Sequence, residues 1–541
     1  MGSMKTPGVY IIEKNAFPNS VVEAPTAIPA FIGYTERAVN GNDDLTNVPW
    51  KISSMTEYIQ YFGGGPDLKF EVDIKDGSLC IEGKNSYTLY YNMMLFFANG
   101  GGACYIVSVG SYKDALKKDS MITGLGKLTL EQEITLVAIP EAVNLSSSEE
   151  FKDIQQQMLS HCGNTMKNRF ALLDIYPKAN EKTKIEDQVN FFCDNIGSSF
   201  LSYGAAYFPW LNTSIVGERD LKGDMFTWTD NAYIHRTQLD AGFAEIVESL
   251  FVEEFEIKEN VVKNGHTFKL EEVVEGDIYA DSDTEKTNVI GRIESIKDIK
   301  EAGNEKVIKK NVKVVWLFPN NVDKQALHQA LYNVSSVYKQ AIKGVLKNLN
   351  LFPPSAAMAG IYTMVDNSRG VWKAPANVTL NYVGSTVEDI DDEQQAELNV
   401  PIHGKAVNVI RLFRGEGVKV WGARTLDGNS LDWRYVNVRR TLLFLEESIK
   451  NAARAYVFEP NDAGTWINMK CMIDSFLRSV WKRGGLAGAT PEDAFEVHIG
   501  LGDTMTAEDI LDGIMRITVL VAVTHPAEFI EITFQQQAQK S

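Results

Sequence analysis

The chain has 541 residues, of which 44% are hydrophobic, 10% aromatic and 23% charged, so it can bury several cores. Its 53 Lys and Arg against 71 Asp and Glu give a formal net charge of −18, which argues against a protein that binds nucleic acid through a basic surface. The five cysteines lie far apart and form no C-x-x-C, which argues against both a disulfide framework and a zinc knuckle.

Targeting signals are weak in this sequence. The start, Met1 to Thr6, fits the permissive myristoylation pattern, but a cloning scar before Met4 or an ordinary exposed start explains it better. The longest apolar stretch, Ile517 to Val523, has the length of a strand and falls short of the roughly 20 residues that span a bilayer. We expect no signal peptide, no direct membrane insertion and synthesis in the cytosol, where the cysteines stay reduced.

The first 25 residues predict an extended arm. A β-branched and aromatic run follows the turn dipeptide at Pro7-Gly8, and Pro18, Pro25 and Pro29 then interrupt the chain. Beyond the arm, helix and strand patterns alternate, which predicts an α/β (mixed α+β) fold with a mixed sheet flanked by helices. The expected helices are 56–62, 89–98 and 148–162, and the expected strands are 103–109, 134–139 and 169–175.

The composition changes near residue 250. Residues 251–310 contain neither Pro nor Trp and show short alternating runs among many charges, so we expect a solvated, β-rich part. A strand at 313–318 then leads to Pro319-Asn320-Asn321, the expected cap of one long helix. That helix is expected to bury a stripe formed by Ala326, Ala330, Val334, Val337, Ala341 and Val345.

Two further helices and two strands are expected before the chain ends. One helix has the stripe Leu442, Leu445, Ile449, Ala452 and Tyr456, and the other has Trp466, Met469, Ile473, Phe476 and Val480 and ends at Arg483-Gly484-Gly485. The strands are expected at 515–523 and 527–534. The second carries bulky residues on both faces, which is typical of an edge that awaits a partner strand.

A search for catalytic and metal-binding patterns returns little. The motifs G-x-S-x-G, H-E-x-x-H and G-x-x-x-x-G-K-[ST] are absent, and the seven histidines have no neighbours at metal-ligand spacing. Glu388, Asp389, Asp391, Asp392 and Glu393, with Glu397, could suggest calcium, but they lack the loop pattern and its glycine. We therefore expect no catalytic residue, no cofactor and no metal.

An opposing basic cluster follows the acidic run within about 50 residues: Arg411, Arg414, Lys419, Arg424, Arg434, Arg439 and Arg440. Blocks of opposite sign suit either ion pairs within the chain or contacts between copies. For any single pair we expect an ion pair within the chain.

Several short blocks occur in an order that resembles the sheath proteins of contractile phage tails and related contractile injection systems. The blocks are Pro7 to Ile11, Phe31 to Glu36, Tyr58 to Gly64, Phe96 to Gly102, Pro353 to Gly360, Asp366 to Asn377, Val420 to Leu426, Asn437 to Thr441, Phe458 to Asp462, Trp466, and Pro526 to Ile530. The resemblance covers roughly residues 5–110 and 315–535, and little of residues 111–314 takes part.

This resemblance implies a domain organisation. We expect an extended arm at 1–25, a sheath core formed by 26–110 with 315–523, an inserted outer region at 111–314 whose part 251–312 is β-rich, and a C-terminal arm strand at 524–541.

The resemblance also implies a function. In such sheaths, six-fold rings stack around an inner tube, with baseplate and cap proteins at the ends, and an extended lattice contracts to drive the tube. Terminal arms add strands to a neighbour's sheet, which maps here to Val9, Tyr10, Ile11, Ile12, Phe529, Ile530, Glu531, Ile532, Thr533 and Phe534.

Two groups of charged residues are further candidates. Asp389, Asp391, Asp392, Glu393, Arg411, Arg414, Arg439 and Arg440 are expected contacts between copies, and Arg478, Lys482 and Arg483 are expected to face the tube. The particle would assemble in a bacterial cytoplasm and belong to a phage virion or a released tail-like particle. Two alternatives stay open, an α/β enzyme of unknown chemistry and a surface-array or adhesin protein.

Overall fold

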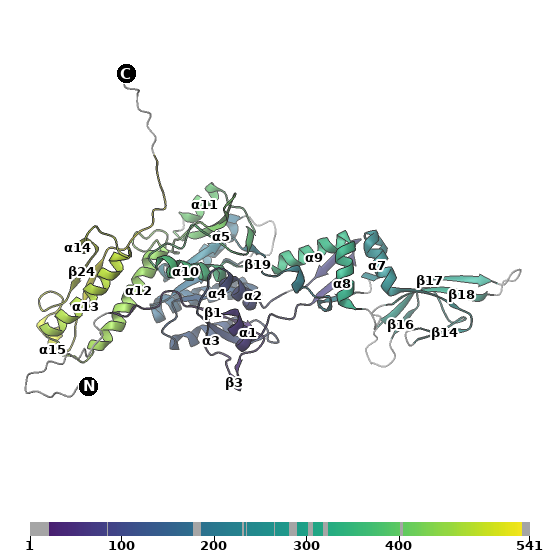
Figure 1. Ribbon diagram of the computed structural model, residues 1–541, viewed down its shortest axis with the longest axis horizontal. Coiled ribbons are helices and arrows are strands. Elements are labelled where there is room, and N and C mark those ends of the chain that lie inside the picture. The colour runs from purple at the N-terminus through teal and green to yellow at the C-terminus, as the bar shows by residue number, and fades with distance from the viewer. Residues whose placement is uncertain are drawn as a thin grey trace, which may run out of the picture. The chain divides into compact units, whose positions relative to one another are not determined.

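The computed structural model describes residues 21–83, 85–176, 185–229, 232–233, 235–263, 266–280, 289–300, 307–316, 323–400 and 404–532 (Figure 1). The chain divides into two compact units. The first contains residues up to 65, 87–213 and 352 onward, and the second contains 66–86 and 214–351. The predicted arm strand at Val9–Ile12 lies outside the described residues, as do Thr533 and Phe534.

The first unit is built on a nine-stranded mixed sheet. Its order is β20 (Val378–Thr379), β23 (Gly417–Val420), β22 (Val407–Phe413), β10 (Gly204–Phe208), β9 (Phe170–Leu173), β8 (Leu136–Ala138), β1 (Pro29–Thr35), β7 (Cys104–Ser111) and β4 (Trp50–Ile52). The strands from β22 through β7 pair in parallel, and β4, β23 and β20 pair antiparallel at the two edges. The α/β prediction is confirmed.

Helices cover both faces of this sheet, as buried parallel strands require. On one face lie α3 (Lys118–Lys127) and α4 (Ser148–Ser160), whose apolar side chains join the main core with Ile32, Val107 and Leu173. On the other lie α2 (Leu89–Ala98) and α10 (Ser355–Arg369). The remaining elements of this region are α1 (Met55–Phe62), α5 (Ile185–Asn195), α11 (Asp392–Asn399), the ribbon β2 (Val39–Asn40) with β3 (Asp43–Asp44), and β11 (Leu211–Thr213) paired with β21 (Val383–Thr386).

A smaller core within the first unit is formed near the end of the chain. The helices α12 (Val436–Ala453) and α13 (Ala463–Lys482) pack with β24 (Phe495–His498) and β25 (Thr518–Val521), and α14 (Pro491–Ala494) and α15 (Ala507–Leu511) complete this part (Figure 1). Met469, Ile473, Phe476 and Val480 are buried on α13 as its stripe predicts. Val21 and Ala24, from the beginning of the described chain, belong to the same core.

The second unit combines helices with strands. A three-stranded sheet has the order β12 (Phe226–Trp228), β5 (Phe70–Lys75), β6 (Ser78–Glu82). A four-stranded sheet has the order β13 (Val252–Ile257), β18 (Val307–Trp316), β17 (Val289–Lys300), β16 (Ile278–Ala280), and β14 (Asn260–Lys263) pairs with β15 (His266–Lys269). These strands pair antiparallel, except β12 and β5, which pair in parallel. The helices are α7 (Ala241–Phe251), α8 (Lys324–Val334) and α9 (Ser336–Leu349), and β19 (Leu351–Phe352) follows them. The prediction of a β-rich part is confirmed.

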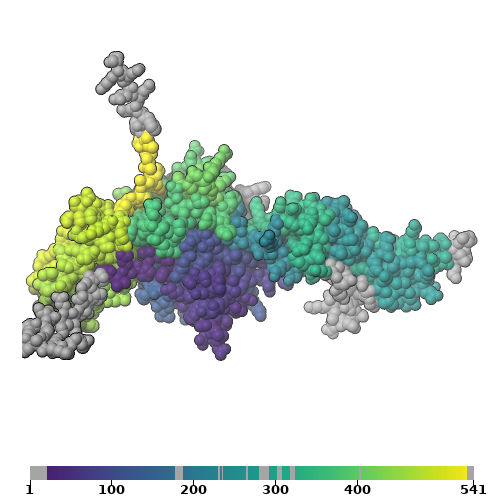
Figure 2. Space-filling model, in the orientation of Figure 1, coloured from purple at the N-terminus to yellow at the C-terminus, as the bar shows by residue number. Residues whose placement is uncertain are grey.

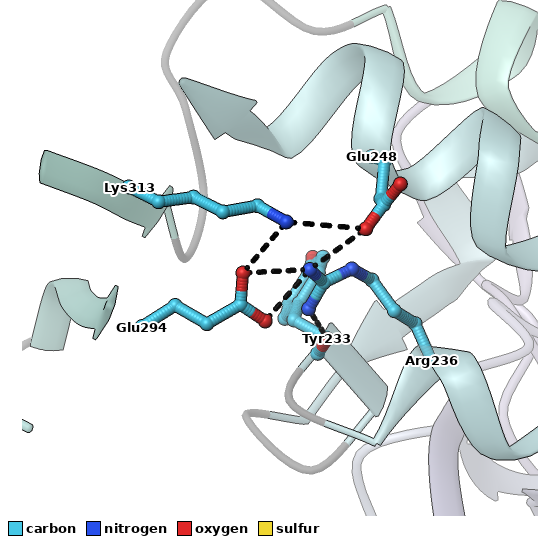
Figure 3. Close-up of polar contacts among 5 residues, drawn as sticks. All are labelled: Tyr233, Arg236, Glu248, Glu294 and Lys313. Atoms are coloured by element: carbon cyan, nitrogen blue, oxygen red, sulfur yellow. Dashed lines mark hydrogen bonds and ion pairs between the residues drawn. The ribbon is translucent and has the colours of Figure 1, made fainter. Parts of the chain in front are cut away.

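A buried arginine joins helix to sheet inside the second unit (Figure 3). The guanidinium of Arg236, 1% exposed, donates to Glu294 at 2.7 and 2.9 Å, to Glu248 of α7 at 3.2 Å and to the carbonyl of Tyr233 at 3.0 Å. Lys313 of β18 lies 3.4 Å from Glu248 and 3.2 Å from Glu294. Two cations and two carboxylates thus balance one another between α7, β17 and β18.

Two sequence predictions about this region need correction. The inserted region does not begin at residue 111, because β8, β9 and β10 lie in the middle of the main sheet, and residues 66–86 belong to the second unit. The long helix after residue 320 is two helices, α8 and α9, because Ser335 leaves the helical conformation and its hydroxyl accepts from the N–H of Tyr338. The predicted stripe is therefore wrong at Val334, which is 54% exposed, and right at Val345, which is buried; Leu331 and Tyr338 are buried outside the stripe.

Candidate functional site

The root of the C-terminal segment is an ion pair between Glu528 and Arg424. Arg424, 3% exposed, donates through Nε at 3.0 Å and through Nη2 at 2.5 Å to the two carboxylate oxygens. The same carboxylate accepts from Asn399 Nδ2 at 3.0 Å and from the hydroxyl of Tyr435 at 3.2 Å. Partial burial would raise the pKa of Glu528, but these hydrogen bonds outweigh it and hold the pKa below its usual value.

Directly after this root the chain exposes apolar side chains. Phe529, Ile530 and Ile532 are 77%, 79% and 70% exposed, and residues 527–532 form no strand in the described chain. Of the strand predicted at 527–534, the described part, 527–532, is not a strand in the isolated subunit. Its pairing with another copy stays a prediction.

The beginning of the described chain is held by a second set of contacts, which we call the strap (residues 23–28). The N–H of Ala24 donates to Ser448 Oγ at 2.9 Å and the N–H of Ile28 donates to Thr135 Oγ1 at 2.9 Å. The carbonyl of Thr26 accepts from Arg440 Nη2 at 2.8 Å. The strap is thus fixed to α12 and to the strand segment that leads into β8.

Arg440 also forms a buried two-bond ion pair. Its Nη1 and Nη2 donate to the carboxylate of Asp366 on α10 at 2.9 and 2.6 Å, and the ring of Tyr362 lies beneath the guanidinium at 4.7 Å. Paired oxygens in the plane of the guanidinium match its fork geometry. One side chain therefore links α10, α12 and the strap.

Arg439 and Arg440 were expected to contact other copies, and the structure corrects this. Arg439, 6% exposed, lies over the rings of Tyr203 and Trp433 at 3.7 and 4.5 Å. Arg440, 4% exposed, is paired as described above. Both guanidinium groups are enclosed by their own chain and are not exposed for contact with another copy.

The acidic run is partly used within the chain. Asp391 caps α11 by accepting from the N–H of Gln394 at 2.8 Å, and Asp392 pairs with Arg411 at 2.7 Å. The internal reading of that charge pair is the one observed. Asp389, Glu393 and Arg414 are exposed, and their role between copies stays a prediction.

The three residues expected to face a tube lie at the C-terminal end of α13. Arg478, Lys482 and Arg483 are exposed, and Arg483 forms an ion pair with Glu23 and lies 5.3 Å from the ring of Trp372. Arg483 is thereby partly committed to the strap. The tube-facing role of the group stays a prediction.

The sheet of β24 and β25 is the best candidate to receive an added strand. Phe495 and Val497 point into the small core, and within the described residues no third strand joins the pair. At one end of β24, His498 has its two ring nitrogens 3.1 and 3.2 Å from Glu496 and Asp503. The hydrogen bond with Asp503, helped by Glu496, raises the pKa of His498.

Buried carboxylates elsewhere in the first unit act as helix caps. Glu141 accepts from the N–H groups of Tyr34, Thr88 and Leu89, and Asp174 accepts from the N–H and hydroxyl of Ser355 at 2.9 and 2.5 Å. Burial raises the pKa of both carboxyls to about 7. Each bonds a helix start, so we assign them to folding.

Metal and membrane sites were also sought. Across the described ranges, no cluster of three His, Cys, Asp or Glu side chains could hold a metal ion. In the same part of the chain, no helix combines the length and apolar character that a membrane crossing needs.

Sequence reasoning missed the most connected residues of the site. Asp366, Arg424 and Glu528 lie in the blocks that carry the family resemblance, but their roles were not assigned. Asp366 and Arg440 lie 74 residues apart in sequence, and Arg424 and Glu528 lie 104 residues apart, so local spacing does not reveal either pair. The signal available in the sequence was their placement inside those blocks.

Comparison with known proteins points to one class. Residues 429–537 match the phage tail sheath C-terminal domain. A tail sheath protein of Vibrio phage KVP40 is 25% identical over 134 residues, which are 25% of this chain and 20% of that relative. The chain thus matches about a fifth of the length of this curated relative.

Solved structures cover far more of the chain. The helical sheath of the anti-feeding prophage in its contracted state is 25% identical over 99% of this chain and 100% of that one, with a TM-score of 0.57. The sheath complex of PVC, an extracellular contractile injection system, is 25% identical over 99% of both chains in its contracted state, with a TM-score of 0.55.

The fold is that of the contractile sheath proteins to which the chain is similar. Residues 429–537, which hold α12, α13, the β24–β25 sheet and Glu528, carry the C-terminal domain of the phage tail sheath family. The resemblance found in the sequence is confirmed.

Proposed function

We propose that this protein is the structural subunit of the contractile sheath of a phage-tail-like injection machine. It polymerises around an inner tube in six-fold rings, and the tube is driven through a target envelope when the extended lattice contracts. The observation that carries the proposal is the combination of an open two-stranded sheet with two chain ends that leave from fixed roots. The matched family is a structural one, and we propose no catalysis and no cofactor.

The proposed links between copies are added strands. The segments 9–12 and 529–534 have the β-forming side chains that strand addition needs, and the β24–β25 sheet offers backbone groups on its outer edges. A strand with about four or five ladder bonds gains on the order of 0.5–1.5 kcal/mol per bond. One link is weak, but its repetition through a lattice holds the copies together while their bodies re-pack.

The proposed partners are further copies of this chain, the inner tube protein and the baseplate and cap proteins. Baseplate association is supported by a similar chain, 25% identical over 99% of this chain with a TM-score of 0.55, that comes from the anti-feeding prophage baseplate. We propose assembly in a bacterial cytoplasm and a final place in a virion or a released particle.

Electron microscopy of the full chain, expressed with its tube and baseplate proteins, tests the proposal. We expect hollow striated cylinders. Ile530→Pro should abolish them, since proline cannot donate to a ladder, while Ile530→Val should retain them. Dispersed particles from the unchanged chain, with all partners present, would reject the proposed function.

A further inference from the structure

Two buried carboxyl groups lie at the same edge of the main sheet. Glu141, 0% exposed, follows β8 and Asp174, 1% exposed, follows β9; these neighbouring strands are parallel, so both acids lie at their carboxyl ends. Glu141 accepts from the N–H of Leu89, the first residue of α2, at 3.2 Å. Asp174 accepts from the N–H of Ser355, the first residue of α10, at 2.9 Å. Each acid thus attaches one helix to the sheet.

The helices α2 and α10 form one layer on a face of the sheet. A Cβ added at Gly360 of α10 would lie 2.6 Å from the carbonyl oxygen of Phe96 in α2. One added at Gly100, just after α2, would lie 2.7 Å from the Cβ of Met364 in α10. Only glycine allows backbones to approach this closely, and closely packed elements transmit strain. A shift of one helix therefore moves the other.

The helix α10 also connects this layer with the strap, which lies in the purple start of the described chain in Figure 2. Asp366, near the end of α10, accepts from Arg440 at 2.9 and 2.6 Å. The same guanidinium donates to the carbonyl of Thr26 in the strap at 2.8 Å. A displacement of α10 therefore changes the charged contact that holds the strap.

The surroundings of Glu141 supply no counter-charge. In the part of the chain that the structure describes, burial and three backbone N–H groups affect its pKa, and no Lys, Arg or His side chain does so. The titratable groups that face it are the phenols of Tyr58 in α1, Tyr87 before α2 and Tyr112 after β7. Burial raises the pKa of all three phenols, so they stay neutral and do not compensate a carboxylate.

Asp174 is equally isolated from cations. It faces the N–H and the hydroxyl of Ser355, which donate at 2.9 and 2.5 Å, and no charged side chain of the described residues affects its pKa. Burial without a counter-charge disfavours the ionised form and raises the pKa of both acids to about 7. Since the unfolded-state pKa is about 4, the stability that the protonated acids contribute is present below that value and is lost as the pH rises through 7.

We propose that Glu141 and Asp174 form a proton-operated latch. While both acids are protonated, α2 and α10 stay attached to the sheet. As the pH rises, the acids release their protons to water, their negative charges remain in the core without compensation, and the helix layer and the strap open more often. The latch is a property of the single subunit, so it does not depend on the proposed function.

Hydrogen exchange of the full, unassembled chain between pH 5 and pH 8 tests the latch. Division of each rate by the intrinsic exchange rate at the same pH leaves the frequency of opening. A pKa of about 7 in the closed state and about 4 in the open state makes opening roughly 100-fold more frequent at pH 8 than at pH 5 for each acid. We expect at least this acceleration in peptides that cover α2, α10 and residues 23–28.

Three variants assign the effect to the two acids. Asp174→Asn and Glu141→Gln, made separately, should each reduce the acceleration at least about tenfold, because each leaves one acid to titrate. Asp389→Asn, at an exposed acid of the first unit, is the matched control and should leave it unchanged. Ser355→Ala keeps both carboxyls and removes only a hydroxyl that stabilises the ionised Asp174, so the midpoint of the pH dependence at α10 should move to higher pH. This variant tests the latch even where a variant without the carboxyl does not fold.

An acceleration below about threefold in the unchanged chain would overturn the inference. So would an acceleration that persists in full in both carboxyl variants, one that is confined to α2 and α10 without residues 23–28, or a midpoint that Ser355→Ala leaves in place. Each of these outcomes leaves the proposed function standing.

Discussion

Replacement of Glu528 by Gln removes the negative charge at the root of the C-terminal segment while it keeps the side chain's size. Arg424, 3% exposed, then loses its counter-charge but retains the carbonyl of Asn399 at 2.9 Å. Removal of one partner from a buried pair costs about 3–5 kcal/mol. Because Gln still accepts through one oxygen and Glu528 is one-fifth exposed, we expect a cost of about 2 kcal/mol.

Hydrogen exchange of the full chain measures this cost locally. The N–H of Arg424 donates to Asn408 Oδ1 at 2.7 Å and the N–H of Thr425 donates to the carbonyl of Arg434 at 2.8 Å. Since 1.4 kcal/mol is a factor of ten, exchange of peptides that cover 420–436 should accelerate about 30-fold. Glu531→Gln, the same change at an exposed acid three residues further on, is the control and should change exchange less than twofold.

The direction in which the pKa of Glu528 is shifted determines the pH at which hydrogen exchange should be measured. The pKa of Glu528 is lowered in the folded chain, so its contribution is present above the unfolded-state pKa and is lost as the pH falls through the lowered value. At pH 7 the anchor is fully formed. If Glu528→Gln and Glu531→Gln exchange at equal rates there, Glu528 is no anchor and the reasoning fails.

Three further predictions follow from the buried charges. Asp366→Asn, which leaves the guanidinium of Arg440 without its counter-charge, should cost about 3–5 kcal/mol and expose the strap to limited proteolysis. Burial raises the pKa of Asp174 to about 7, so the stability that its protonated form contributes is present below the unfolded-state pKa and is lost as the pH rises through 7. The free energy of unfolding in urea should therefore decline between pH 5 and 8, and Asp174→Asn should remove about 2–3 kcal/mol of that decline. Arg236→Met should destabilise the second unit by about 2–4 kcal/mol in tryptophan-monitored unfolding, whereas Lys258→Met, at an exposed pair, should change it by less than about 1 kcal/mol.

Local patterns predicted single elements well where the periodicity was undisturbed. The helix at 89–98 and the stripe on α13 were read correctly, because a polar stop and an apolar spacing are both visible in sequence. The break at Ser335 was missed although Ser is a favoured N-cap residue, because the apolar spacing continues past it. A distant contact supports the same break: the hydroxyl of Ser335 donates to Asp240 at 3.0 Å. The contact with Asp240, 95 residues away in sequence, cannot be read from the residues around position 335.

The ion pairs also show that contacts between residues far apart in sequence cannot be predicted from local patterns. The acidic run and the arginine cluster are close in sequence, which suggested that they meet, but among the residues quoted above only Asp392 and Arg411 do so. Arg424 and Arg440 instead pair with Glu528 and Asp366, at separations that only the topology of the sheet and helices closes. A single sequence identifies the charged residues, whereas their pairing belongs to the fold.

If the proposed function holds, the relative strengths of the strap contacts and of the strand pairing between copies decide which of them breaks first when the lattice changes. The strap combines hydrogen bonds from Ala24 and Ile28 with a charged bond at Thr26 and the burial of Val21. Neutral bonds contribute about 0.5–1.5 kcal/mol each and charged ones about 1.5–3. That sum, with apolar burial added, equals or exceeds the few ladder bonds of one added strand, so strand pairing between copies should slip before either root detaches. A sheath that slides at its links and keeps its roots can change lattice without losing connection between its subunits.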